Sequence, residues 1–295
     1  MTSEPTQETP SGSSRKRLPW HRRVADAFRY RSSASNTVTV ATASTMIVLA
    51  VVGFIVVNSE GWPRFQAVFF DAEIFAERFP QILYAFRKNV QLFITAEILI
   101  LIGGLLLAVL RSLPGPIFFP FRAAAIAYID IMRGLPSILV IYILGFGIPA
   151  LRLPGVPNDP FIWALVALTM VWSAYVAEVY RAGIESVHPS QNAAARSLGL
   201  SAFQSMRFVV LPQAVRRVVP PLLNDFIGLM KDTALISFIG PIEAFRQAQI
   251  ANTATFNFTP FLVTAAIFLL LTIPMARFVD WLVARDRRRQ LAGAQ

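Results

Sequence analysis

Long runs without charge are the feature of this sequence that most limits how the chain can fold. Residues 38–57 are twenty consecutive residues without Asp, Glu, Lys or Arg, and residues 89–110 hold a single charged side chain, Glu97. A helix needs about 20 mostly apolar residues to cross a bilayer, so such runs predict an all-helical, polytopic membrane protein. Further uncharged runs cover 134–151, 160–177 and 258–276.

The composition supports this interpretation. Hydrophobic residues make up 55% of the chain and charged residues 15%, whereas a soluble domain carries about 25% charged residues. This excludes an ordinary soluble globular protein and a disordered chain. Cysteine is absent, which excludes disulfides, thiolate metal sites and cysteine nucleophiles.

A weaker candidate for a sixth span lies at 218–230, where Pro220, Pro221 and Asp225 interrupt the apolar pattern. Proline removes a backbone donor, so we expect a helix broken at these prolines. Broken helices are tolerated at membrane depth where they line a cavity or are buried in protein. The expected fold is all-α, with six transmembrane helices. The spans are predicted near 38–58, 89–110, 134–151, 160–180, 214–236 and 258–280.

Basic residues gather in segments that alternate with the spans. Residues 1–37 carry seven Lys and Arg against three acids, the loop 111–133 carries three arginines, and the long loop 181–217 carries five. The positive-inside rule places these segments and both termini in the cytoplasm. The net charge of +10 therefore fits a membrane protein better than a nucleic-acid-binding one. The remaining segments are predicted as a disordered tail (1–37), an extracytoplasmic loop (59–87) and a cytoplasmic tail (286–295).

Motifs for catalysis are missing. The only lysines are Lys16, Lys88 and Lys231, and none follows a glycine, so the chain has no phosphate-binding loop and is not expected to hydrolyse ATP. The only histidines, His21 and His188, are too few for a histidine-based metal site, and no metal site is expected. Polar residues at membrane depth are costly and usually face a cavity or a partner, which favours transport over catalysis.

The loop 181–217 has the local pattern of two short helices. Pro189 suits a first helical turn, and Gly199 suits a helix stop in the left-handed region. Ser201, with a glutamine three residues later, predicts a capping box for a second helix, which Pro212 should end or bend. These helices would form a rigid projection that fills a groove on a partner. An ordinary amphipathic connector lying on the membrane is the alternative.

This loop resembles the EAA loop of ABC importer permeases. The resemblance rests on Ala194-Ala195, on Gly199 and on Leu211-Pro212, which begins twelve residues after Gly199. Ala193 stands where that family has the glutamate that names the loop, so one anchoring or partner contact is missing. The surrounding segments are similar to the polar amino-acid branch of the family: IDIMRGLPSILVIYILGFGIP at 129–149, WSAYVAEVYRAGIESV at 172–187 and VVLPQAVRRVVPPLLNDFIGLMKDTALIS at 209–237.

The resemblance implies a type I importer permease of the bacterial cell membrane that forms the path for a polar amino acid. A five-helix core at 88–285 would follow one accessory helix at 38–58. The loop 184–213 would couple to an ATPase chain through residues 188–204; ATP and magnesium would bind that chain, and no cofactor is expected here. A second permease subunit, identical or related, and an extracytoplasmic solute-binding protein would complete the importer. The implied coupling residues are Ser190, Gln191, Ala193, Ala194, Ala195, Leu198, Gly199 and Leu200.

Polar residues in the spans are candidates for the substrate path. Glu178 and Arg181 share a helical face and can pair, either as a structural ion pair or beside the path. An unpaired Glu97 would cost about 3 kcal/mol in mid-span, so it must pack inside the bundle or contact substrate. Asp225 and Lys231 have charges complementary to an amino acid, although Lys231 has neighbouring carboxylates to pair with. The path candidates are Glu97, Tyr175, Glu178, Asn224, Asp225 and Lys231, and the candidates for an inner boundary or gate are Arg133, Gly134 and Pro136.

Two other functional classes remain open from the sequence. A channel or secondary carrier would transport without ATP, and a membrane enzyme with buried carboxylates would turn over substrate without an ATPase. Secondary carriers often show inverted repeats, and the sequence shows none.

Overall fold

The computed structural model describes residues 20–292, which divide after Arg64 into two compact units. The first unit contains α1 (Trp20–Val57), which includes the first predicted span. The predicted disordered tail is wrong over residues 20–37, which belong to α1, and its first nineteen residues lie outside the described part. No proline or glycine interrupts the chain between residues 20 and 52, so nothing local stops the helix at its polar end.

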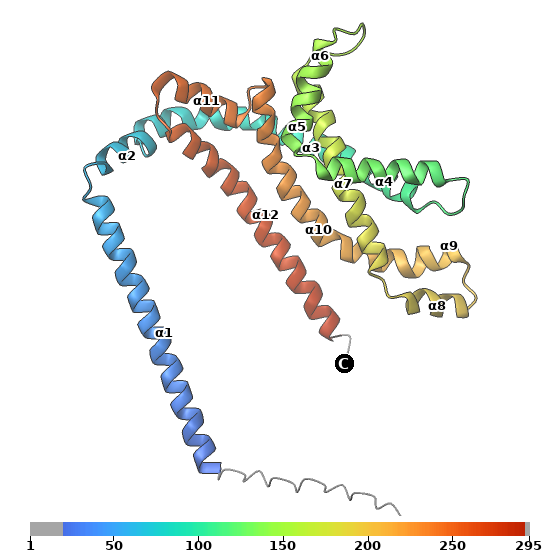
Figure 1. Cartoon of the computed structure of the whole chain (residues 1–295), viewed down its shortest axis with the longest axis horizontal. Helices are drawn as coiled ribbons and strands as arrows, with labels where there is room; N and C mark the ends of the chain where they lie inside the picture. The colour runs from blue at the N-terminus through green and yellow to red at the C-terminus, as the bar shows by residue number, and fades with distance from the viewer. Residues whose placement is uncertain (1–19, 293–295) are drawn as a thin grey trace, which may run out of the picture. The chain divides into compact units, whose positions relative to one another are not determined.

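The second unit is built from helices of very different lengths (Figure 1). Its segment at 72–87, expected as part of an extracytoplasmic loop, is instead the first part of a long helix, α3. The short helix α2 comprises Trp62–Phe69. Two of the later segments, η1 and η2, are π-helices, and a third, η3, is a 3-10 helix. In chain order, the segments after α2 are α3 (Ala72–Ser112), α4 (Phe119–Gly134), α5 (Ser137–Tyr142), η1 (Ile143–Gly147), α6 (Ile148–Ala150), α7 (Pro160–Glu185), α8 (Pro189–Ser197), α9 (Ala202–Ser205), η2 (Met206–Val210), α10 (Leu211–Asp232), η3 (Thr233–Ile239), α11 (Ala244–Thr255) and α12 (Thr259–Ala292).

Four helical stretches of the described residues are long and apolar enough to cross a membrane. A fifth is formed by α4 together with the α5–α6 segment, if this pair, bent by 103°, counts as one span. The protein is therefore an all-helical membrane protein with four to five candidate spans. The four single stretches are Val38–Val57, Trp62–Ser112, Pro160–Glu185 and Thr259–Arg285.

The predicted break at Pro220 and Pro221 is wrong, because α10 runs without interruption from Leu211 to Asp232. Adjacent prolines deprive only two carbonyls of their helical donors, which neighbouring groups in a helix bundle can replace. Pro212 also fails to end its helix. The π-helix η2 precedes it and leads directly into α10. The wider π turn relieves the clash between a proline ring and the carbonyl four residues earlier.

Two glycines allow α3 to pack closely against α7. A Cβ atom on Gly104 would lie 2.6 Å from the Val176 side chain, and one on Gly103 would lie 2.6 Å from the Ser173 hydroxyl. Small residues let helices approach in this way in membranes, where packing rather than the hydrophobic effect holds them together. This contact fixes α3 against the helix that carries most of the candidate site.

A buried polar cluster joins α3 to the segment between η3 and α11. The Asn89 amide donates to Glu243 Oε2 at 2.8 Å and to Thr233 Oγ1 at 3.1 Å, and its oxygen accepts from the Ala244 N–H at 3.1 Å. Glu243 in turn caps α11 by accepting two backbone N–H groups. Burial raises the pKa of the Glu243 carboxyl, and these hydrogen bonds oppose that shift.

Replacing Asn89 with alanine is expected to destabilise the protein by about 2 kcal/mol, because it leaves buried donors and acceptors unpaired. Asn89 and Glu243 are both fully buried, so water cannot easily replace the lost partner. The thermal unfolding midpoint in detergent would measure the effect. Asn224→Ala removes the same side chain from an exposed position of α10 and should leave the midpoint unchanged. Equal midpoints for the two variants would contradict the structural role of Asn89.

Candidate functional site

A cavity of about 440 Å³ lies between the end of α4, the second half of α7 and the middle of α10. Three arginines and two carboxylates line it. The structure thus brings together three of the predicted path residues, Tyr175, Glu178 and Asp225, with the predicted gate residue Arg133. The polar and aromatic residues of its lining are Arg133, Tyr175, Glu178, Arg181, Ser186, Arg217 and Asp225.

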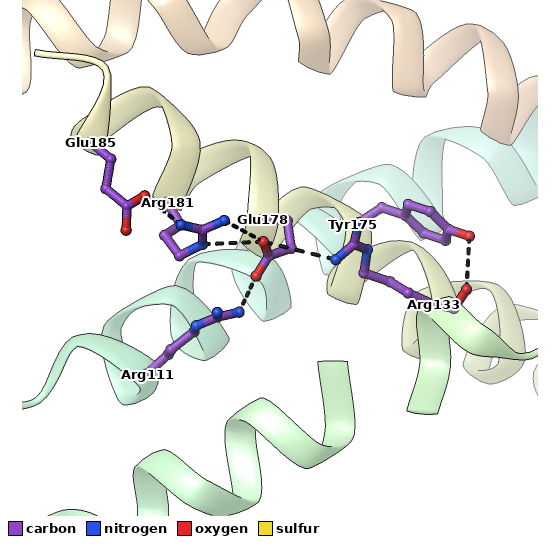
Figure 2. Close-up of polar contacts among 6 residues, drawn as sticks. All are labelled: Arg111, Arg133, Tyr175, Glu178, Arg181 and Glu185. Atoms are coloured by element: carbon purple, nitrogen blue, oxygen red, sulfur yellow. Dashed lines mark hydrogen bonds and ion pairs between the residues drawn. The ribbon is translucent and has the colours of Figure 1, made fainter. Parts of the chain in front are cut away.

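Glu178 is the centre of an ion-pair network beside this cavity (Figure 2). One carboxylate oxygen accepts from Arg111 at the end of α3. The other accepts from Arg181 at 2.8 and 3.1 Å and lies 3.8 Å from an Arg133 nitrogen. Arg181 also pairs with Glu185, one turn further along α7. A single carboxylate therefore ties α3, α4 and α7 together, and the predicted pairing of Glu178 with Arg181 is confirmed.

Positive charge in the cavity exceeds what the carboxylate of Glu178 can neutralise. Arg217 donates to the backbone carbonyl of Ser186, which is a neutral partner. The Arg133 side chain is 42% exposed, and its guanidinium nitrogen lies 3.8 Å from the nearer Glu178 oxygen. On α10, Asp225 Oδ2 is buried and has no hydrogen-bond partner among residues 20–292. The cavity is therefore lined by arginine donors and by Asp225, one carboxylate oxygen of which has no hydrogen-bond partner among the described residues.

Glu97 lies next to the cavity without lining it. It interacts electrostatically with Asp225 across the α3–α10 contact. Its Oε1 atom is buried, and no described residue forms a hydrogen bond with it. Leaving a buried acceptor unpaired costs about 1–3 kcal/mol. The buried, unpaired oxygens of Glu97 and Asp225 therefore lower the stability of the fold.

The structure does not assemble the predicted pair of Asp225 and Lys231. They are six positions apart, which places them about 120° apart around the helix. Lys231 is exposed and interacts with Asp232 instead, as the alternative interpretation expected. Asp232 accepts from the Trp172 indole at 3.2 Å. Asn224 is exposed and lies outside the cavity lining.

The predicted gate segment is the bend between α4 and α5. Leu135 has the extended backbone that a following proline imposes, and Pro136 is the N-cap residue of α5. The two helices meet at 103°. The Tyr175 hydroxyl donates to the Arg133 carbonyl at 3.5 Å. A Cβ atom on Gly134 would meet no heavy atom within 4 Å, so the bend depends on Pro136 rather than on space at Gly134.

The loop predicted to couple to a partner forms a hairpin of α8 and α9. Gly199 ends α8 at φ +86°, and the N–H groups of Gly199 and Leu200 bond back to the carbonyls of Arg196 and Ala195. This is the Schellman arrangement that requires a left-handed residue. The predicted capping box of Ser201 is present.

One side-chain hydrogen bond that the sequence did not suggest links the two helices of the hairpin. The Ser205 hydroxyl donates to Asn192 Oδ1 at 2.6 Å, and Ser205 is fully buried. Ala195 is buried as well, and Leu200 is partly exposed. The other predicted coupling residues are exposed and accessible to a partner: Ser190, Gln191, Ala193, Ala194, Leu198 and Gly199.

Comparison with known proteins assigns the chain to a family. Residues 100–288 match the family described as the binding-protein-dependent transport system inner membrane component. The chain belongs to this family. It is therefore a multi-pass transport component of the inner membrane rather than an enzyme. This excludes the two alternatives left open by the sequence, a membrane enzyme and a channel or secondary carrier. Membership implies an ATPase and a binding protein as partners.

Individual relatives agree over most of their length. The chain is 34% identical over 206 residues to the arginine transport system permease protein ArtQ of Bacillus subtilis, which covers 70% of this chain and 92% of ArtQ. It is 36% identical over 213 residues to the glutamate transport system permease protein GluC of Corynebacterium efficiens, and the match covers 68% of this chain and 92% of GluC. A crystal structure of an amino acid ABC transporter with histidines matches with a TM-score of 0.67 at 31% identity, covering 73% of this chain and 98% of that chain.

Proposed function

We propose that the cavity at Asp225 binds the polar amino acid that this chain, the permease subunit of an amino acid ABC importer, moves across the membrane. The relatives are named for arginine and glutamate, and the matching solved structure is of an amino acid transporter. Arginine and glutamate have opposite side-chain charges, so what they share is an α-ammonium and an α-carboxylate. The observation that carries the proposal is a cavity whose lining combines Arg133 and Arg217 with Asp225, whose Oδ2 atom no described group bonds.

The residues of the cavity suit the two ends of an amino acid. The unpaired oxygen of Asp225 would accept from the ammonium group, and Arg133 or Arg217 would donate to the carboxylate. Charge-assisted hydrogen bonds of this kind are about twice as strong as neutral ones. Glu97 would contribute to the negative field around the ammonium group, since it interacts with Asp225.

We further infer that the chain has six spans with both termini in the cytoplasm. The helix α10 is the span that we add to the five candidates described above. Its 22 residues would extend about 33 Å, close to the thickness of the hydrocarbon core. Most of its charged residues lie toward its two ends: Arg216 and Arg217 at one, Lys231 and Asp232 at the other. The remaining charged residue, Asp225, lines the cavity. A second permease subunit would complete the path.

The hairpin of α8 and α9 would dock on the ATPase, which would hold ATP and magnesium. Leu198 is 85% exposed and Phe203 is 70% exposed, and apolar side chains this exposed at a hairpin suit burial in a partner groove. Residues 188–204 would carry the displacement of the ATPase into η2 and α10, which continue directly from α9. The missing glutamate at Ala193 leaves this geometry intact.

Asp225→Asn tests the binding site in proteoliposomes that contain the whole importer, after competition by unlabelled amino acids has identified the substrate. Loss of a charged hydrogen-bond partner costs about 1.5–3 kcal/mol, so uptake at low substrate concentration is expected to fall about 10- to 100-fold. The measurement is the initial rate of labelled amino-acid uptake against substrate concentration.

Asp280→Asn is the matched control, because Asp280 is an exposed residue of α12 whose described ion pair is with Arg277. Its uptake should stay within about twofold of the unmodified chain, since exposed pairs contribute little. Unchanged uptake by Asp225→Asn would overturn the placement of the substrate. The coupling of the hairpin to ATP hydrolysis would be untouched by that result.

A further inference from the structure

The helix α8 begins at a histidine whose ring bonds to its first turn. His188 is the N-cap residue, and its Nδ1 atom accepts from the Ser190 N–H at 3.2 Å. Pro189, the first helical residue, has no N–H to satisfy, and the Gln191 N–H donates to the His188 carbonyl at 2.9 Å. The imidazole therefore supplies the side-chain acceptor that serine, threonine, aspartate or asparagine supplies at most helix N-termini.

This cap requires a neutral imidazole. A ring nitrogen accepts a hydrogen bond only when it carries no proton, so the proton of the capping ring lies on Nε2. A second proton would bind Nδ1, and the Ser190 N–H would then face a donor. The Ser190 hydroxyl, 2.7 Å from Nδ1, can reverse its role and accept, but the backbone N–H cannot. The imidazolium would also place a positive charge at the positive end of the helix dipole.

The elements around His188 offer the charged ring no carboxylate that is free to pair with it. The nearest acid along the chain, Glu185, pairs with Arg181 one turn earlier on α7. Buried Val187 packs against η2 and the start of α10. The charged residues of α8, of η2 and of the first half of α10 are all arginines: Arg196, Arg207, Arg216 and Arg217. Since a released ring can bind a second proton without losing the helix N–H, acidification favours release.

Release of the ring would loosen the hairpin of α8 and α9. A helix of nine residues is marginal in water without tertiary contacts. One such contact begins in the first turn of α8, where Asn192 Oδ1 accepts from the hydroxyl of buried Ser205 at 2.6 Å. Asn192 lies one turn after His188, so fraying at the cap would break the hydrogen bond that joins the two helices.

We propose that His188 is a positioning residue of the hairpin, and that it makes ATP-driven transport sensitive to the pH of the cytoplasm. Neutral His188 caps α8 and holds the hairpin in the form that docks, whereas protonated His188 leaves the cap. Histidine ordinarily changes charge between about pH 5 and 8, so transport falls as the cytoplasm becomes acidic. This inference rests on the docking of the hairpin and on the topology proposed above.

Uptake at two cytoplasmic pH values tests the effect on transport. Proteoliposomes with the complete importer hold ATP in a lumen buffered at about pH 7.5 or about pH 5.5, while the outer buffer stays at about pH 7.5. Only molecules whose hairpin faces the lumen are then driven. Loss of an N-cap reduces the helix population about fivefold, so uptake by the unmodified chain should be up to about fivefold lower at the acidic value.

Two substitutions at His188 separate the cap from the other effects of pH. His188→Asn should abolish this loss, because asparagine accepts the same hydrogen bond at either pH. His188→Ala should transport slowly at both values. His21→Asn is the matched control, because His21 is the other histidine of the chain and lies in α1. This control should keep the pH response of the unmodified chain. The same response in the unmodified chain and in His188→Asn would overturn the proposal.

Hydrogen–deuterium exchange of residues 188–198 reports the cap without transport. At about pH 5.5 the amides of α8 should be about fivefold less protected in the unmodified importer than in His188→Asn, and at about pH 7.5 they should be equally protected. Equal protection at both values would overturn the cap itself. A difference in protection without a difference in uptake would leave the cap standing and would overturn the docking of the hairpin, on which its effect on transport depends.

Discussion

Replacing Gly199 with valine is expected to abolish most ATP-driven uptake while leaving the transmembrane helices inserted. Gly199 has φ +86° and ends α8 in a Schellman motif. A residue other than glycine has a conformational free energy about 1–2 kcal/mol higher in this left-handed region, and the cost for a β-branched residue is near 2 kcal/mol. A cost of about 2 kcal/mol reduces the population of the native turn about thirtyfold relative to its alternatives. The hairpin would then present Leu198 to the ATPase in the wrong place.

The measurement is amino-acid uptake and ATP hydrolysis in proteoliposomes containing the complete importer. No heavy atom lies within 4 Å of the position that a Cβ atom on Gly199 would occupy, so backbone strain alone should cause the loss. Gly199→Asn should therefore transport within about twofold of the unmodified chain, because asparagine tolerates the left-handed region. Gly53→Val, at another glycine with open space around it but ordinary φ, should have no effect. Unchanged uptake by the valine variant at position 199 would count against a coupling role for the hairpin.

The sequence predicted the features that depend on neighbouring residues. The uncharged runs at 38–57 and 160–177 lie within α1 and α7, because hydropathy over 20 residues is enough to identify a span. The stop at Gly199 and the capping box at Ser201 were also predicted correctly. Each depends on a few adjacent side chains and backbone groups, so spacing alone reveals it.

Features set by tertiary packing were missed. The helix α10 continues through Pro220 and Pro221, a continuity that a helix bundle tolerates and that local propensity does not predict. The Leu135–Pro136 segment suggested only the start of a span, whereas α4 and the α5–α6 segment meet there at 103°. The pairing of Glu178 with Arg181 was predictable from the three-residue spacing. Arg111 lies 67 residues from Glu178, so only the contact between α3 and α7 could reveal it.

Replacing Glu178 with glutamine is expected to destabilise the protein by about 2 kcal/mol and to lower the thermal unfolding midpoint by about 5 °C. Removing one member of a buried ion pair leaves its partners uncompensated, and here Arg111, Arg133 and Arg181 would lose their shared carboxylate. The expected cost is below the value for a fully buried pair because the arginine side chains are 26–42% exposed. Substrate uptake should fall as well, since α3, α4 and α7 would no longer be held together beside Asp225.

Glu185→Gln separates this effect from a general loss of negative charge. Both glutamates pair with Arg181 on the same helix, but the side chain of Glu178 is 15% exposed and that of Glu185 is 61% exposed. Water screens an exposed pair, so the change at Glu185 should cost at most about 0.5 kcal/mol. A midpoint lowered equally in both variants would mean that Arg181, rather than the carboxylate shared by three helices, holds the network. A large change confined to Glu178 would identify that carboxylate as the group on which the geometry of the cavity depends.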